Sequence, residues 1–175
     1  MIATAFSWLV FLSAALVAVV ASVLMVTRRN PVHSALWLIV TFFSLGILYL
    51  SLNAQFIAVA QVIVYAGAIM MLILFVIMLI HLEKEPEQAK KVSGAKIIGS
   101  FITIILFLEI IAAVLAFQVT GRKGTFTPEV LARVGDVKAV GTALYGKYLF
   151  PFEIASILLL IGIVGAVVLS KRRKD

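Results

Sequence analysis

The chain has 175 residues, of which 63% are hydrophobic and 13% charged, and it carries a formal net charge of +7. A soluble domain is roughly half apolar and about a quarter charged, so this chain has too few polar groups to cover a globule in water. It contains no cysteine, which excludes disulfides and thiolate-held zinc or iron–sulfur centres. We therefore predict an all-α integral membrane protein, with residues 1–175 forming a single membrane domain of five transmembrane helices.

The first two predicted spans cover residues 3–26 and 32–52. The first is uncharged, no basic residue precedes it, and its apolar run exceeds the ~7–15 residues of a signal peptide core. In the short connection between the spans, Asn30 suits a helix N-cap and Pro31 suits the first helical position. A connection this short makes the two helices antiparallel neighbours.

The third predicted span covers residues 56–82 and follows a short uncharged break at Ser51–Gln55. It is longer than the ~20 residues that cross the hydrocarbon core. The surplus predicts a tilt, an extension beyond the bilayer or an irregular turn.

The rest of the chain holds two further spans. A charged linker, 81–96, leads to the fourth span at 97–119. A glycine-rich loop follows at 120–149, in which we expect at most a short surface helix. The fifth span covers 150–169 and ends at the basic tail Lys171–Lys174.

The basic residues predict an orientation. Ten of the fifteen lie in the Arg28 connection, the linker and the tail, which share one side of the membrane, and the other five lie in the 120–149 loop. The positive-inside rule then places the N-terminus and this loop outside and the C-terminus in the cytoplasm. Because the charges sit at helix ends, we expect a lipid bilayer rather than a nucleic acid as partner. No targeting presequence is visible, which predicts a bacterial plasma membrane or, as the alternative, organelle-encoded synthesis.

Two carboxylates lie within predicted spans. Glu109 is near the middle of its span, where a charge costs roughly 2.5–3.5 kcal/mol. It is either a proton-relay acid or an interface glutamate paired with a neighbouring chain. Glu153 follows Pro151, in what we expect to be the first turn of the last span. It is either a structural acid at the helix N-terminus or an ion-pair or proton site near the outer surface.

The middle of the third span carries its strongly polar side chains. Gln61 and Tyr65 are four residues apart and share a helix face. Gly67 lies between two alanines and permits deformation or close approach of another backbone. This pattern fits either a deformable helix beside hydrated space or a packing notch with interhelical hydrogen bonds. The two histidines, His33 and His81, are isolated and make a poor metal site, and we expect neither catalytic residues nor a bound cofactor.

Several stretches resemble a known family. They are 30–36, 61–70, 74–79, 141–148 and 152–156. In these stretches the chain resembles subunit J of NADH:quinone oxidoreductase (respiratory complex I), the counterpart of mitochondrial NADH dehydrogenase chain 6.

The resemblance implies a place in the membrane arm near the quinone site, beside the A-, H-, K- and N-type subunits. FMN, iron–sulfur clusters and quinone then belong to the parent complex. It also implies a π-bulge around Tyr65, Ala66 and Gly67, whose rearrangement makes or breaks a water path toward the antiporter-like subunits. Some relatives carry a glutamate where this chain has Gln61, and Glu109 matches no family motif.

These features predict a subunit that couples quinone reduction to proton pumping without a redox centre of its own. Two alternatives stay open. One is a subunit of a related cation/proton antiporter or membrane-bound hydrogenase, and the other is an assembly or scaffold protein without an ion path.

Overall fold

The computed structural model describes residues 2–80, 94–116 and 127–171. Within these ranges every regular element is a helix, and five helices are long and apolar enough to cross a membrane, which confirms the predicted all-α membrane fold. The chain divides into two compact units: Met1–His81 with Phe126–Asp175, and Leu82–Thr125. The single membrane domain stays a prediction.

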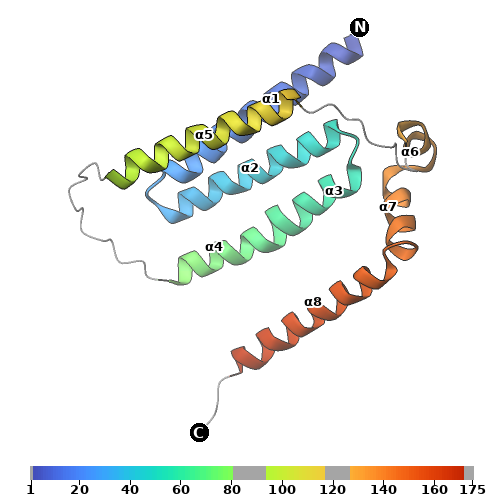
Figure 1. Cartoon of the computed structure of the whole chain (residues 1–175). Helices are drawn as coiled ribbons and strands as arrows, with labels where there is room; N and C mark the ends of the chain where they lie inside the picture. Colours follow the sequence, from blue (N-terminus) through green and yellow to red (C-terminus); the bar gives the residue numbers. More distant parts are fainter. Residues whose placement is uncertain (1, 81–93, 117–126, 172–175) are drawn as a thin grey trace. The chain divides into compact units, whose positions relative to one another are not determined.

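The first two helices, α1 (Ile2–Thr27) and α2 (Pro31–Ser51), pack side by side as an antiparallel pair (Figure 1). Near their connected ends, the Ser34 hydroxyl of α2 donates a hydrogen bond to the Met25 carbonyl of α1. Small side chains let the two helix backbones approach closely. Among residues 5–27 of α1, the buried side chains are those of Ala14, Ala18 and Ala21.

The connection between α1 and α2 has the predicted cap. The Asn30 side chain accepts hydrogen bonds from the backbone N–H groups of Val32, at 2.9 Å, and His33, at 3.4 Å. Pro31 is the first helical residue. Both predictions hold because the start of α2 is capped by residues immediately around it.

The second helix ends in a Schellman motif. The Ala54 N–H donates to the Tyr49 carbonyl and the Asn53 N–H donates to the Leu50 carbonyl, each at 3.0 Å. Asn53 has φ 61°, the left-handed conformation that this cap requires and that asparagine tolerates. The chain reverses here and enters the third membrane helix.

The third membrane helix runs without interruption through Gln55–Leu79, 25 residues. It consists of α3 (Gln55–Ala60), a π-helical segment η1 (Gln61–Ile69) and α4 (Met70–Leu79). At the end of η1 the Met70 N–H donates to the Tyr65 carbonyl, five residues back, as in a π turn. An irregular turn is thus one source of the surplus length. The end expected at residue 82 lies outside the described residues.

The predicted loop 120–149 contains two helices where at most one was expected. They are α6 (Pro128–Val134) and α7 (Asp136–Tyr145), and they contact each other. Gly135 joins them with φ 85°, a conformation that side chains disfavour. Gly141, which suggested a loop, lies inside α7. Gly135 therefore marks a helix junction and Gly141 a helix interior, so a count of glycines alone overestimated the irregular chain.

The start of α6 carries an acid with an altered pKa. The pKa of Glu129 lies below its ordinary value because the Thr127 side chain, and secondly the backbone of Glu129, donate hydrogen bonds to the carboxylate. Glu129 is therefore ionised at neutral pH, and its charge is favourable in the first turn of a helix.

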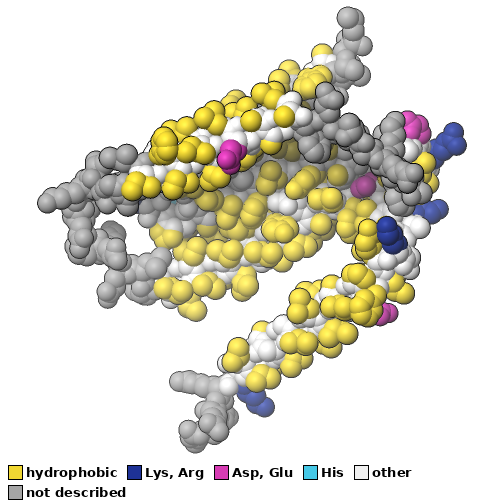
Figure 2. Space-filling model, in the orientation of Figure 1, with side chains coloured by type: hydrophobic (Ala, Val, Ile, Leu, Met, Phe, Trp, Pro, Cys, Tyr) yellow, Lys and Arg dark blue, Asp and Glu magenta, His cyan; other side chains and the backbone are white. Residues whose placement is uncertain are grey.

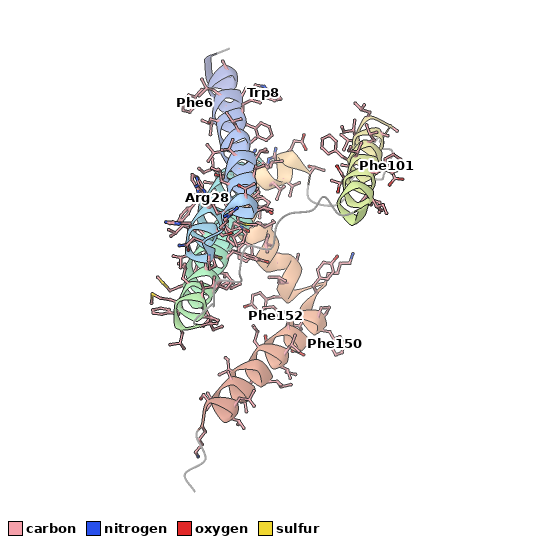
Figure 3. The ribbon with its side chains drawn as sticks, turned by 90° about the vertical axis from the view of Figure 1, so that its left-hand side faces the viewer. Phe6, Trp8, Arg28, Phe101, Phe150 and Phe152 are labelled. Carbon is pink, nitrogen blue, oxygen red and sulfur yellow. The ribbon has the colours of Figure 1, made fainter. Side chains whose placement is uncertain are left out.

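The last membrane helix is α8 (Leu149–Ser170), which contacts α7. At the turn between them the Tyr145 and Phe152 rings lie 5.3 Å apart in an edge-to-face arrangement. Figure 3 labels Phe150 and Phe152 at the start of α8. A Cβ atom at Gly146 would lie 2.8 Å from the Thr142 carbonyl oxygen, so this turn requires glycine. Among the described residues of α8, none is buried.

The second unit contains α5 (Gly94–Ala116). Its residues 98–116 are exposed, and most are large and apolar. Apolar side chains also cover much of the visible surface of the other long helices (Figure 2). Such surfaces suit lipid or neighbouring membrane helices. The linker 81–93, the span end at 117–119 and the tail 172–174 lie outside the described residues.

Candidate functional site

The candidate site is the π-helical segment η1 in the middle of the third membrane helix. It begins with Gln61, a buried polar residue with 7% of its surface exposed. It also contains Tyr65, Ala66 and Gly67, the residues at which the resemblance implies an irregular turn. Segments with i→i+5 hydrogen bonds are rare and concentrate at functional sites. A role for these residues stays a prediction.

The Tyr65 side chain lies at the boundary between α2 and the open surface. Its ring contacts that of Phe42 edge-to-face, with centroids 5.6 Å apart and planes at 66°. The residue is still 48% exposed in this chain. One part of the side chain is therefore fixed by α2, while the rest can meet water, lipid or another subunit.

The second helix approaches the start of η1 at Gly46. A Cβ atom there would lie 3.2 Å from Cγ2 of Val62 and 3.8 Å from the carbonyl oxygen of Ala58. A groove of about 280 Å³ follows the same contact, and its lining includes Phe43 and Ile63. Sequence reasoning missed Gly46, although a glycine inside an apolar span is a signal for close helix contact.

Two further polar residues that sequence reasoning passed over are buried in α2. The Thr41 hydroxyl donates to the Trp37 carbonyl at 3.0 Å, and the Ser44 hydroxyl donates to the Val40 carbonyl at 2.9 Å. Hydroxyl groups bonded to their own helix are satisfied without a partner helix. Gln61, in contrast, carries a longer amide with two donors and one acceptor oxygen, so it can hold water or a neighbouring polar group.

Gly67 lies on an exposed part of η1. A Cβ atom there would meet the Val62 carbonyl oxygen at 3.4 Å, the lower limit of ordinary van der Waals contact. An alanine therefore fits, whereas a branched side chain adds atoms beside a carbonyl of the preceding π turn.

The position of Glu153 differs from the prediction. Because α8 begins at Leu149, Glu153 is the fifth residue of the helix and no acid lies in the first turn. Pro151 does not delay the helix, since the first N–H groups have no intrahelical partner to lose. The favourable interaction of a carboxylate with the helix dipole declines beyond the first turn. The dipole therefore stabilises Glu153 less than the predicted position in the first turn implied.

The other described candidates lie on exposed parts of their own helices. Glu109 is exposed on α5, and Glu153 is exposed on α8. His33 is exposed near the start of α2, whereas His81 lies outside the described residues. In the ranges that the structure describes, no three of the residue types His, Asp and Glu gather as metal ligands would.

Residues 21–169 match the family model of NADH-ubiquinone/plastoquinone oxidoreductase chain 6. The chain belongs to this family. The match includes all of η1 and most of α8, and it confirms the resemblance noted in the sequence.

Individual members of the chain 6 family give the same result. NADH-quinone oxidoreductase subunit J of Pseudomonas aeruginosa is 38% identical, with 89% of this chain and 92% of that protein aligned. Subunit J of Escherichia coli K12 is 36% identical over 86% of this chain and 79% of its own length. The chloroplastic NAD(P)H-quinone oxidoreductase subunit 6 of Psilotum nudum is 35% identical over 83% and 80%.

Proposed function

We propose that this chain is a membrane-arm subunit of a proton-translocating NADH:quinone oxidoreductase and couples quinone reduction to proton pumping. The coupling element is η1, a deformable segment beside the quinone region whose rearrangement opens or closes a water path. The observation that carries the proposal is a nine-residue π segment between two α-helical sections, in a chain that belongs to the chain 6 family.

Two properties of η1 support a switch over ordinary packing. A π turn holds one more residue than an α turn, so the segment can change its register without breaking the whole helix. The side chains needed to order water, Gln61 and Tyr65, lie in this segment, and Gly67 leaves room beside its backbone. Helices that only pack have no need of such a segment.

The chain itself supplies no proton carrier at Gln61, since an amide does not take up a proton near neutral pH. The path therefore runs through water, with relay acids on neighbouring subunits of the A, H, K and N types. FMN, iron–sulfur clusters and quinone belong to the parent complex. Tyr65 orients water through its hydroxyl.

Purification of the tagged chain from its native membrane tests the assembly. Co-purified flavin and iron–sulfur subunits, with quinone-dependent NADH oxidation and proton uptake in reconstituted vesicles, are the expected result. Co-purified antiporter or hydrogenase subunits without a flavin subunit would favour the first alternative. A tagged chain that co-purifies only with inactive, partly assembled subunits would favour an assembly protein.

The second prediction concerns orientation in the bacterial plasma membrane. We expect α6, α7 and the start of α8 outside and Lys171 in the cytoplasm, because ten of fifteen basic residues then lie inside. Single cysteines at the exposed positions Arg133 and Lys171 can be labelled with an impermeant thiol reagent in this cysteine-free chain. Arg133→Cys should react in right-side-out vesicles and Lys171→Cys only after permeabilisation. The reverse labelling pattern in the same vesicles would show the opposite topology.

A third prediction concerns Glu153. We expect Glu153→Gln to retain most of the proton uptake, because glutamine keeps the shape and hydrogen bonding while the lost dipole interaction is small beyond the first turn. Proton uptake per NADH oxidised in vesicles with equal complex content measures this. Complete loss of uptake in a fully assembled complex would identify Glu153 as a proton carrier instead.

A further inference from the structure

The outer end of the third membrane helix is capped by a residue from a distant part of the chain. The Phe56 N–H in the first turn of α3 donates a hydrogen bond to Oδ2 of Asp136, 80 residues later, at 2.8 Å. The N-cap position of α3 is occupied by Ala54, which has no capping side chain. A helix start requires acceptors for its first N–H groups, and a carboxylate is a strong one. Asp136 therefore takes the place of the missing local cap.

The local structure of α7 places Asp136 at this point. Gly135, with its positive φ, directs the chain into α7, and Asp136 is the first residue of that helix. Asp136, Ala139 and Ala143 lie on one face, at spacings of three and four residues. Ala139 is buried, with 4% of its surface exposed, and α7 contacts α3. The hydrogen bond thus belongs to a packed contact between two helices.

The two ends of the third helix are held differently. The section before η1 is fixed by Asp136 at Phe56 and by the close approach of α2 at Gly46. The section after η1 also contacts α2 and buries Met70, as the section before η1 buries Ala58, but in the described part of the chain only the section before η1 also contacts α7. A register change of one residue in η1 rotates one section against the other by roughly 100°. With the outer section fixed, the rotation falls on α4.

We propose that Asp136 is a positioning residue that ties α7 to the outer end of the third helix, so that rearrangement of η1 moves α4 rather than α3. This inference rests on the proposed coupling function of η1. The inference adds a fixed end of the third helix to the proposed function, and α7, between the fourth and fifth spans, supplies that fixed end.

The experiment compares Asp136→Ala, Asp136→Asn and Glu129→Ala in the whole complex in membrane vesicles. Electron transfer to quinone, proton uptake and subunit content are measured together. We expect Asp136→Ala to assemble and reduce quinone but to lose proton uptake per electron. Asp136→Asn keeps one acceptor oxygen and should retain the wild-type ratio. Glu129→Ala removes an acid from the first turn of α6, where its hydrogen-bond partners are Thr127 and its own backbone, and should leave the ratio unchanged.

A double variant separates a tie between helices from a simple cap. Ala54→Asp with Asp136→Ala supplies a carboxylate within α3 without the contact to α7. If Asp136 acts by linking α7 to α3, the double variant should still take up fewer protons per electron than the wild type. Full recovery of proton uptake per electron would overturn this inference. A wild-type ratio in assembled Asp136→Ala complexes would also overturn the inference. The proposed function fails separately, if the wild-type complex reduces quinone without moving protons.

Discussion

Replacing Gly67 by valine is expected to leave the complex assembled and able to pass electrons, while lowering the protons moved per electron or slowing quinone reduction. The reason is local. A Cβ atom at this position already meets the Val62 carbonyl oxygen at 3.4 Å, within the preceding π turn. The additional methyl groups of valine stiffen the backbone and crowd the space into which the segment must rearrange.

The expected size follows from the strain on the valine side chain. Gly67 is exposed, so the crowding comes from the backbone of its own helix, and a χ1 angle forced off its rotamer costs about 0.5–1.5 kcal/mol. If one of the two forms of η1 carries this cost and the other does not, their ratio changes by roughly 2- to 10-fold. A shift of that size biases the segment toward one form through the catalytic cycle.

Gly67→Ala is the matched control, because its single Cβ makes only ordinary contact. We expect values near those of the wild type for alanine and the defect for valine. Tyr65→Phe should have a milder effect, since it keeps the edge-to-face contact with Phe42 and removes only the hydroxyl. Quinone reductase activity and proton uptake are measured on the same reconstituted vesicles. Wild-type values for both in normally assembled Gly67→Val complexes would show that η1 is ordinary packing.

The features that the sequence predicted correctly are those set by neighbouring residues. The five spans follow from runs of apolar residues. The N-terminal cap of α2 follows from the adjacent residues Asn30 and Pro31. The third span was predicted to be too long for a regular crossing, because its length and hydropathy can be read from one continuous stretch of sequence. The irregular segment itself extends over Gln61–Ile69, a wider region than the three residues that the resemblance singled out.

The features that sequence reasoning missed depend on contacts between distant residues. Nothing near Ala54 shows that its helix is capped by Asp136, since the two lie far apart in the chain. The residue that Gly46 meets, Val62 of another helix, becomes visible only when the two helices are placed side by side.

The last prediction concerns this contact between α2 and η1. Gly46→Val is expected to lower the amount of assembled complex and its thermal stability, by overpacking worth about 1–3 kcal/mol. Even a Cβ atom at this position lies 3.2 Å from Cγ2 of Val62, and the additional carbons of valine point into the same space. Because the nearest backbone atom, the Ala58 carbonyl oxygen, is 3.8 Å away, the Val62 side chain is the main obstacle.

This geometry predicts that a second substitution can reverse the loss of stability. In Gly46→Ala the Cβ atom meets Cγ2 of Val62 alone at short distance, so Val62→Ala in the same chain removes the obstacle. We expect Gly46→Ala to destabilise the assembled complex mildly, Gly46→Val strongly, and Val62→Ala to restore most of the loss in the alanine variant. Subunit content after purification and the midpoint of thermal inactivation of quinone reductase activity measure the series. Normal assembly and stability of Gly46→Val would mean that α2 does not press against the start of η1. The section of the third helix before η1 would then be held by the Asp136 hydrogen bond without a second restraint from α2.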